Sequence, residues 1–302
     1  VYELTFPTFI MGWVFALLQR GRAAMQRIDE VLDTAPSIAD RGDAARVDRL
    51  RGEIEFRNLS FRYDAGREEA LRGVSLHVPA GSVLGVVGPI GSGKSTLASL
   101  IPRLFDVPDG QLFLDGVDVN RIPLRTLRSH IAMVPQDAFL FSMSLADNVA
   151  YGLPDADPGR VREAAERAQL AKDVVELPDG YDTLVGERGV MLSGGQRQRT
   201  ALARALALRP SILILDDTLS SVDTETEAAI RRNLREVFEG RTVIVISHRV
   251  ASVRDADQVV VLDEGRIVER GDHEALIAHG GLYARLARDQ ELEDELEREG
   301  AA

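Results

Sequence analysis

The stretch VLGVVGPIGSGKSTLASLI, residues 83–101, decides the fold of this chain. It begins with an apolar run typical of a buried strand, passes through a glycine-rich loop and continues in a helix-forming segment. The loop fits the phosphate-binding pattern G-x-x-x-x-G-K-[ST], whose fixed positions here are Gly88, Gly93, Lys94 and Ser95. In such a loop, backbone N–H groups and a helix N-terminus surround a polyphosphate, the lysine reaches the terminal phosphates and the hydroxyl contacts Mg²⁺.

The lysine of this loop is rare in the chain. Lysine and arginine together number 36, but the only two lysines are Lys94 and Lys172. A planar guanidinium does not replace a compact ammonium charge beside phosphates, so a lysine at this position supports the phosphate-binding interpretation.

Other segments predict an α/β fold around a parallel sheet. Three apolar runs, each bounded by polar residues or glycine, are typical of parallel strands buried on both faces, and they are Val83–Val87, 212–215 and 243–246. The alternating segment 52–63 predicts a further strand, and Asp115-Gly116 and Glu264-Gly265 predict turns between strands. The pattern is helical over about 138–201, most clearly at 161–171.

A second glycine-rich segment, LSGGQ at 192–196, precedes the helix-forming sequence QRQRTALARALAL. The hydroxyl of Ser193 and the N–H groups of Gly194 and Gly195 then lie at a helix N-terminus, which is a second anion site. One folded copy holds one nucleotide per phosphate-binding loop. We therefore expect this second half-site to belong to the nucleotide of a partner.

Composition narrows the class of protein. The formal net charge of -12 argues against a general nucleic-acid surface, which needs clustered lysine and arginine. The chain has no cysteine, which excludes disulfides and cysteine-ligated zinc.

The N-terminal segment has a different character. Residues 4–19 carry no charge and precede Arg20 and Arg22, and a run of this length falls short of the about 20 residues that cross a bilayer. Because the sequence opens with Val1, we expect the last part of a membrane-spanning helix, with the two arginines on the cytoplasmic side and a helical extension up to Pro36. A buried helix of a soluble domain is the alternative.

These features predict four regions. They are the end of a transmembrane helix and its cytoplasmic extension (1–36), a charged linker (37–51), a nucleotide-binding domain (52–288) with a helical subdomain at about 138–201, and an acidic tail (289–302). The tail has helical composition, and two interpretations stay open, a solvated helix end or a short dimer zipper.

The ordered motifs resemble the nucleotide-binding domain of ABC transporters, of the exporter type in which a membrane domain precedes the ATPase. The resemblance covers about 52–288 and rests on Tyr63, the P-loop, Gln136, LSGGQ, the apolar strand ending in Asp216 and Asp217, SSVD at 220–223, and His248. It implies a P-loop NTPase with a parallel-sheet core, an antiparallel β-subdomain and a helical subdomain. The segment 187–189 resembles the one that senses the partner's membrane domain.

The resemblance also implies site residues for ATP and Mg²⁺. Nucleotide contacts are implied for Tyr63, for Gly88, Pro89, Ile90, Gly91, Ser92, Gly93, Lys94, Ser95 and Thr96, and for Ser193, Gly194, Gly195, Gln196 and Asp223. Tyr63 would stack on adenine. Mg²⁺ contacts are implied for Ser95, Gln136 and Asp216, and catalytic roles for Gln136, Asp217 and His248.

One residue departs from the family pattern. The family usually has a glutamate after the Mg²⁺-binding aspartate, whereas this chain has Asp217, one methylene shorter. A displacement of about 1 Å can cost on the order of 10²-fold in rate. The pattern resembles the half of a heterodimeric exporter whose own site is degenerate and slow and whose LSGGQ completes the partner's site. A homodimer with a tolerated Asp217 is the alternative.

The resemblance implies a half-transporter in the cell membrane, multi-pass, with its nucleotide-binding domain on the cytoplasmic side and a second ABC half-transporter as partner. Two other functions stay open, a soluble ABC ATPase without transport and a catalytically silent ATP-binding subunit. Nothing in the sequence identifies the exported substrate.

Overall fold

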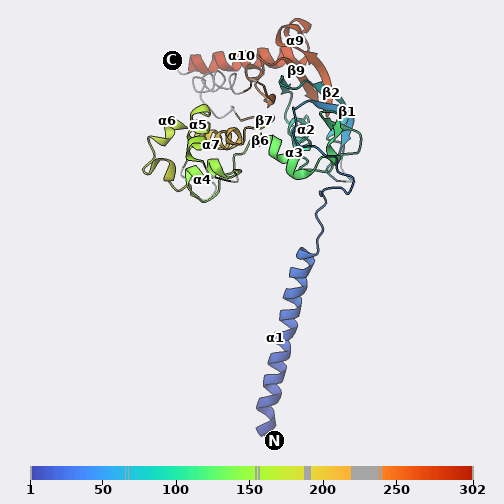
Figure 1. Cartoon of the computed structure of the whole chain (residues 1–302), viewed down its shortest axis with the longest axis vertical. Helices are drawn as coiled ribbons and strands as arrows, with labels where there is room; N and C mark the ends of the chain where they lie inside the picture. The colour runs from blue at the N-terminus through green and yellow to red at the C-terminus, as the bar shows by residue number, and fades with distance from the viewer. Residues whose placement is uncertain are drawn as a thin grey trace. The chain divides into compact units, whose positions relative to one another are not determined.

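A computed structural model describes residues 2–64, 66, 68–153, 155, 157–186, 192–218, 238 and 240–300. The chain divides into two compact units, Val1–Ala39 and Asp40–Ala302. Figure 1 shows the elements of each unit along the chain.

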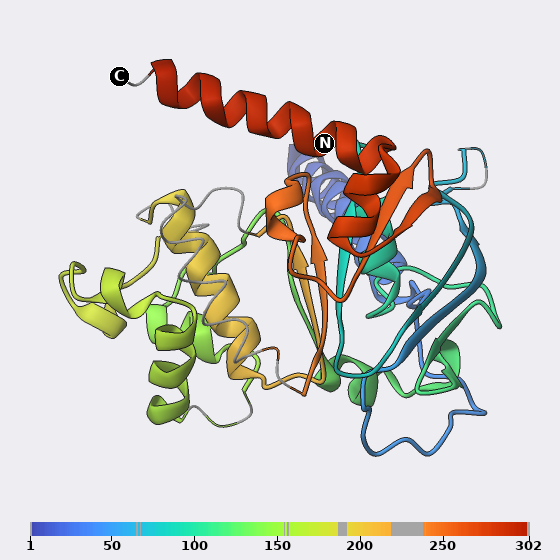
Figure 2. The same ribbon diagram turned by 90° about the horizontal axis from the view of Figure 1, so that it is seen from above.

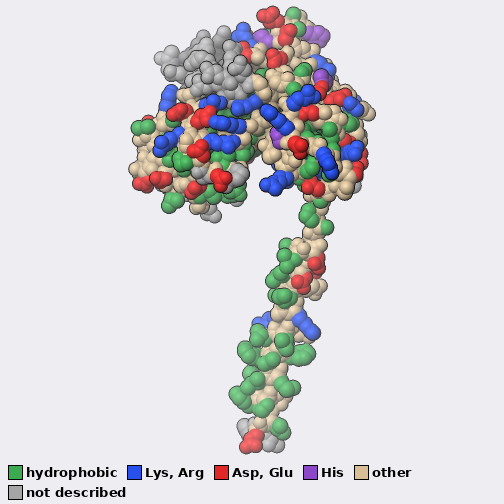
Figure 3. All heavy atoms as spheres, viewed as in Figure 1, with side chains coloured by type: hydrophobic (Ala, Val, Ile, Leu, Met, Phe, Trp, Pro, Cys, Tyr) green, Lys and Arg blue, Asp and Glu red, His purple; other side chains and the backbone are tan. Residues whose placement is uncertain are grey.

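The first unit is a single long helix, α1 (Tyr2–Leu32), with Pro7 near its start. Its apolar side chains are exposed and gather toward the N-terminal end, among them Phe9, Trp13 and Leu18 (Figure 3). A helix is thus confirmed in this segment, but it ends at Leu32 and not at Pro36 as predicted. Among the helices in the described part of the chain, none combines the length and the apolar character needed to cross a bilayer.

The second unit is built on a six-stranded sheet with the order β10-β9-β3-β8-β7-β6. Its strands are β3 (Val83–Val87), β6 (Ile131–Val134), β7 (Ile212–Asp216), β8 (Thr242–Ile246), β9 (Gln258–Asp263) and β10 (Arg266–Gly271). All neighbours pair in parallel except β10, which returns antiparallel to β9 at the sheet edge. The three strands predicted from apolar runs are confirmed as adjacent parallel strands, and their carboxyl ends meet at one edge.

A smaller antiparallel sheet has the order β2-β1-β4-β5. Its strands are β1 (Ile54–Phe61), β2 (Leu71–Val78), β4 (Leu112–Leu114) and β5 (Val117–Asp118). The predicted turns are confirmed, since Asp115-Gly116 joins β4 to β5 and Glu264-Gly265 joins β9 to β10. Both residues of each pair have positive φ, which suits the twist of a tight hairpin.

A helical subdomain lies to one side of the six-stranded sheet (Figure 2). It contains α4 (Leu145–Ala150), α5 (Pro158–Arg167), α6 (Ala171–Val174), η2 (Gly180–Asp182) and α7 (Gly194–Ala207). The remaining described helices are α2 (Lys94–Leu100), η1 (Val119–Arg121), α3 (Leu124–His130), η4 (Val250–Ser252), α9 (His273–His279) and α10 (Leu282–Gly300). The helical character predicted for the acidic tail is confirmed as far as Gly300.

The helix predicted over 161–171 differs from the observed one. Helix α5 begins earlier, because the side chain of Asp157 caps it by accepting a hydrogen bond from the N–H of Gly159. It ends at Arg167, because Gln169 adopts a left-handed φ of 58° and Leu170 N–H bonds back to Ala165 O at 2.8 Å. That six-residue closure is a Schellman-type helix end, which a glutamine does not announce in the sequence.

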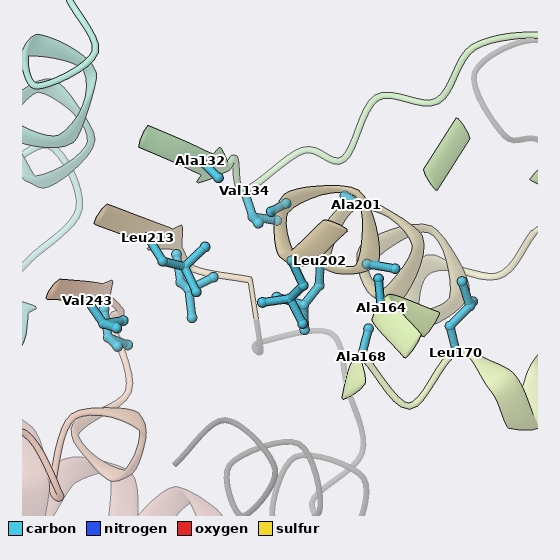
Figure 4. Packing of buried hydrophobic residues seen from close by; sticks show 14 of the residues in the cluster. Ala132, Val134, Ala164, Ala168, Leu170, Ala201, Leu202, Leu213 and Val243 are labelled. Atoms are coloured by element: carbon cyan, nitrogen blue, oxygen red, sulfur yellow. The ribbon is translucent and has the colours of Figure 1, made fainter. Parts of the chain in front are cut away.

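Two apolar clusters hold the second unit together. One fills the space between the two sheets and includes Ile54, Phe56 and Leu262. The other joins the six-stranded sheet to the helices. In Figure 4, Leu202 of α7 lies between Leu213 of β7 and Ala164 of α5, so α7 is packed against both the sheet and its own subdomain.

The segment that enters the second unit packs on it from Asp40 onward. The Asp40 carboxylate accepts from Leu124 N–H at 2.6 Å, and Arg41 pairs with Asp109 at 2.7 Å. Leu50 is 1% exposed in the cluster between the sheets. The domain boundaries drawn from the sequence stay predictions.

Candidate nucleotide-binding site

The glycine-rich loop Gly88–Gly93 joins the end of β3 to the start of α2. Gly88, Gly91 and Gly93 have φ values of 151°, 80° and 100°, a backbone conformation that side chains other than glycine rarely adopt. The space is also closed, because a Cβ on Gly88 would lie 2.0 Å from Leu262 O and one on Gly93 would lie 2.6 Å from Ala70 O. The loop therefore needs glycine at these positions before any ligand binds.

Replacing Gly88 with alanine is expected to lower the free energy of unfolding of the nucleotide-free chain by about 3 kcal/mol. Alanine disfavours the φ of this position, and its Cβ would collide with Leu262 O. Gly91→Ala is the matched control, since Gly91 also has positive φ but has nothing within 4 Å of its would-be Cβ. Gly91→Ala should lower the free energy of unfolding by only about 1 kcal/mol. Denaturant unfolding of both variants measures the difference, and equal losses would contradict the contact with Leu262 O.

Lys94 is the first residue of α2, and its ammonium group folds back over the loop. Nζ donates to Gly88 O and Pro89 O, each at 2.8 Å, and to Ser92 Oγ at 3.4 Å. Burial lowers the pKa of Lys94, while the charges of Asp217 and Asp216 oppose this shift. A partly buried cation whose hydrogen bonds among the described residues go to neutral oxygens is available for an anionic ligand that offers better acceptors.

Asp216 ends β7 and is 5% exposed. Burial raises the pKa of its carboxyl group, and a hydrogen bond with Ser95 acts in the opposite direction. A carboxylate and a hydroxyl beside each other at the edge of a phosphate-binding loop are the oxygen ligands that Mg²⁺ prefers, so these two residues fit the metal implied by the resemblance.

Asp217 lies at the centre of the three residues predicted to be catalytic. Its Oδ2 is 2.8 Å from His248 Nδ1 and accepts from Gln136 Nε2 at 3.4 Å. The three residues come from segments after β7, β8 and β6, which are adjacent strands. The parallel sheet thus brings them to one point. Asp217 has a left-handed φ of 48°, which aspartate tolerates better than most residues.

These groups share one cavity of about 310 Å³. Its lining residues are Ile90, Gly91, Lys94, Ser95, Gln136, Asp216, Asp217, Ile246, Ser247 and His248. The lining combines residues of the phosphate-binding loop and the start of α2 with two carboxylates and His248. The cavity can therefore hold a polyphosphate with a metal ion next to a group that orients water.

Tyr63 follows β1 at the rim of the second unit. The residue is 44% exposed, and its hydroxyl is 2.8 Å from Thr96 Oγ1 on α2. Phe61 and Phe105 contact the ring edge-on, with centroids 5.0 Å and 4.9 Å away. Tyr63 is thus fixed close to the phosphate-binding helix, and its predicted stacking on adenine stays a prediction. The sequence did not single out Phe105.

The LSGGQ segment forms the start of α7. Ser193 Oγ accepts from Gln196 N–H at 3.2 Å, and Gln196 Oε1 accepts from Ser193 N–H at 3.0 Å, which is a capping box. None of Ser193, Gly194, Gly195 and Gln196 is among the residues that line the cavity just described. Asp223, the rest of SSVD at 220–223 and the segment 187–189 lie outside the described residues.

The comparisons with known proteins agree with this geometry. The family model described as ABC transporter matches residues 71–220, a range that holds the phosphate-binding loop, LSGGQ, Asp216 and Asp217. A solved structure described as a bacterial Atm1-family ABC exporter with ATP bound superposes with a TM-score of 0.88 at 40% identity, over 95% of this chain and 50% of that chain. The chain contains an ABC transporter nucleotide-binding domain of the exporter type.

Relatives of this domain carry names of different transport systems. The chain is 48% identical over 295 residues to an ATP-dependent lipid A-core flippase of Aromatoleum aromaticum, which covers 97% of this chain and 49% of that protein. It is 45% identical over 284 residues to the cyclolysin secretion/processing ATP-binding protein CyaB of Bordetella pertussis, which covers 94% of this chain and 40% of that protein. The chain spans at most about half the length of these curated relatives.

One further residue of the nucleotide-binding domain was not predicted from the sequence. Arg204 of α7 donates from Nε to Asn148 O at 2.8 Å, from Nη1 to Phe139 O at 2.9 Å and from Nη2 to Asn148 Oδ1 at 2.9 Å. Burial lowers the pKa of this guanidinium. Arg204 therefore ties the segment after Gln136 to the helix that begins at LSGGQ. The only signal in the sequence was a charged residue within the apolar run LARAL.

Proposed function

We propose that this chain is the ATP-binding and ATP-hydrolysing part of an ABC exporter, and that ATP with Mg²⁺ binds in the cavity beside Lys94. The single observation that supports this most is the convergence of Lys94, Asp216, Asp217 and His248 on one cavity of about 310 Å³. Tyr63 would take the adenine, and N–H groups of the glycine-rich loop with Lys94 would hold the phosphates.

Each residue has a defined part in hydrolysis. Asp216 and Ser95 would hold Mg²⁺, which when bound offsets the negative charge of the phosphates, and Gln136 would stay within reach of it. His248 would donate a hydrogen bond to the terminal phosphate. Asp217 would orient the attacking water, and it already accepts from Gln136 and lies 2.8 Å from His248.

We propose that this chain's own site binds ATP but hydrolyses it slowly. The carboxylate of Asp217 is one methylene shorter than the glutamate usual in the family. Because misplacing a reacting group by about 1 Å can cost on the order of 10²-fold, turnover should fall, while the groups that bind ATP are complete. A homodimer in which Asp217 works through an additional water is the competing hypothesis.

The position of LSGGQ supports a partner. Its residues start a helix whose N–H groups suit an anion, yet they do not line this chain's own cavity. A head-to-tail pair of domains would place LSGGQ of each copy against the nucleotide of the other. In the heterodimer that we propose, the partner is a second ABC half-transporter with glutamate after its Mg²⁺-binding aspartate.

The helix α1 supports attachment to a membrane. Phe9, Trp13 and Leu18 on this helix are 74%, 57% and 60% exposed, which is unfavourable in water. We propose that it is the end of the last transmembrane helix of a multi-pass protein in the cell membrane, with the nucleotide-binding domain on the cytoplasmic side. Closure and reopening of paired domains would then switch the membrane path, and the exported substrate stays open.

The variant Gly194→Asp tests the role of LSGGQ. A carboxylate at the first turn of α7 suits the helix dipole, and a Cβ at Gly194 meets only Arg197 Nη2, at 4.0 Å, so the fold should tolerate it. In the head-to-tail pair, however, the same carboxylate would face the terminal phosphate of the other copy's ATP and repel it. We expect MgATP-dependent association of the full chain, or of the chain with its partner half, to weaken by on the order of 10²-fold.

Sedimentation of the detergent-solubilised full chain with MgATP and with MgADP measures this effect. Gly194→Ala is the control and should associate nearly as the wild type does, because it adds no charge. Equal association of all three chains with MgATP would contradict the head-to-tail arrangement.

A further inference from the structure

The loop that carries His248 is held from outside by a residue of the C-terminal helix. Gln290 of α10 accepts from Val250 N–H through Oε1 at 2.7 Å and donates from Nε2 to His248 O at 2.5 Å. A glutamine amide offers one acceptor and one donor side by side, so a single side chain satisfies the backbone on both sides of Arg249.

The loop also has other anchors, because Val250 is 4% exposed and packs in the apolar cluster that joins the six-stranded sheet to the helices. Ser247 N–H bonds to Val86 O at 3.1 Å, and Arg249 N–H bonds to Ser247 Oγ at 2.9 Å within the loop. The side chain of His248 is 51% exposed, and its Nδ1 is 2.8 Å from Asp217 Oδ2, the contact that orients the ring among the described residues. Where the backbone of His248 lies thus depends on Gln290 as well as on the sheet.

Helix α10 is a firm support at this point. Its N-terminal N–H groups, those of Leu282 and Tyr283, are capped by the carboxylate of Glu269. Tyr283 is fully buried, and its hydroxyl is 2.9 Å from His273 Nδ1. Because the start of the helix is fixed in this way, the Gln290 side chain holds the backbone of the His248 loop in a defined place.

We propose that Gln290 is a positioning residue, which fixes the backbone of His248 so that the imidazole keeps its contact with Asp217 and faces the nucleotide. This inference rests on the proposed function, in which His248 contacts the terminal phosphate. Gln290 itself is not among the residues that line the nucleotide cavity, so it acts only through the loop. The C-terminal helix is thereby part of the machinery for hydrolysis.

Two variants of the full chain separate the effect of the Gln290 hydrogen bonds from the effect of its side-chain packing. Gln290→Met keeps the length and the helical preference of the side chain but removes both hydrogen bonds. Gln290→Glu keeps the acceptor for Val250 N–H but sets an oxygen against His248 O in place of the donor. Asp289→Asn is the control, because Asp289 is exposed on the same helix and, among the described residues, no hydrogen bond or ion pair joins it to this loop.

The first readout is the imidazole signal of His248 in the NMR spectrum of the nucleotide-free full chain with labelled histidine. The chain has 5 histidines, and the His248 signal is assigned by its loss in His248→Gln. We expect Gln290→Met and Gln290→Glu to shift this signal toward that of a free histidine, and Asp289→Asn to leave it in place.

The second readout is single-turnover hydrolysis, measured in the wild-type and the Asp217→Glu backgrounds. Both Gln290 variants should lower the rate constant by on the order of 10-fold, while affinity for MgATP changes less than about twofold, because only orientation is lost. If Gln290 had only a structural role, both variants would lower thermal stability but leave the His248 signal and the rate of the folded fraction unchanged.

The outcomes distinguish this inference from the proposed function. An unchanged His248 signal in folded Gln290→Met overturns the positioning role. If that variant does not fold, Gln290→Glu decides in the same way. Absence of any turnover in both backgrounds would contradict the proposed ATPase activity, whereas a His248 signal that responds to Gln290 would still support the positioning role.

Discussion

Replacing Lys94 with alanine is expected to lower the affinity of the full chain for MgATP by at least about 10²-fold and to abolish measurable turnover. Lys94 is the only lysine or arginine among the described residues that line the cavity, and its ammonium group donates to the carbonyl groups of the loop. In a cavity of low polarity a charge acts more strongly on phosphates than it does in water. Calorimetric titration with MgATP measures the loss.

The chain offers a matched control for this variant. Lys172, the only other lysine, lies on α6, away from the cavity, so Lys172→Ala should bind MgATP as the wild type does. Thermal unfolding without nucleotide should be little changed in Lys94→Ala, because burial lowers the pKa of Lys94, so folding disfavours its charged form, and this offsets the loss of its hydrogen bonds to the loop. Retained affinity in Lys94→Ala would place the nucleotide elsewhere.

Replacing Asp217 with glutamate is expected to raise the single-turnover rate by on the order of 10²-fold, because the added methylene moves the carboxylate about 1 Å closer to the nucleotide. Affinity for MgATP should stay within a few-fold, since neither Lys94 nor Asp216 changes. Rapid-quench measurement of ADP formation with enzyme in excess gives the rate.

Asp217→Asn is the control for this gain, because it keeps the shorter side chain and removes the charge, and it should be slower than the wild type. Glutamate tolerates the left-handed backbone at this position less well than aspartate, so rates should be expressed per folded molecule. An unchanged rate in Asp217→Glu would favour the hypothesis of a tolerated aspartate.

Local sequence was enough to predict the parts of the site that form within one segment. Strand β3, the glycine-rich loop and α2 follow each other directly, and the loop glycines are required by the backbone at Gly88 and Gly93. The hairpin turns at Asp115-Gly116 and Glu264-Gly265 were likewise predictable, because each is encoded by its own two residues.

Tertiary contacts were predicted only in part. Gln136, Asp217 and His248 were identified through the family resemblance, but their convergence follows from the strand order, which places β6, β7 and β8 side by side. The parallel runs suggested neighbouring strands without fixing that order. The hydrogen-bond partners of Arg204 and Gln290 could not be predicted from the sequence, since each bond joins positions that are 40 or more residues apart.

The end of α5 was missed for a different reason. Gln169 takes a left-handed conformation that glycine or asparagine usually provides, and the 2.8 Å bond from Leu170 N–H to Ala165 O stabilises it only in the folded chain. Periodicity alone continued the helix to 171, because Leu170 is apolar and buried after the helix has ended.

The most direct test of the central claim measures two quantities on one preparation of the wild-type full chain, the affinity for MgATP and the single-turnover rate of the bound ATP. Our account predicts saturable MgATP binding with hydrolysis on the order of 10²-fold slower than in the Asp217→Glu chain. Fast hydrolysis by the wild-type chain alone, equal to that of the glutamate variant, would contradict the slow site and with it the proposed asymmetric pair.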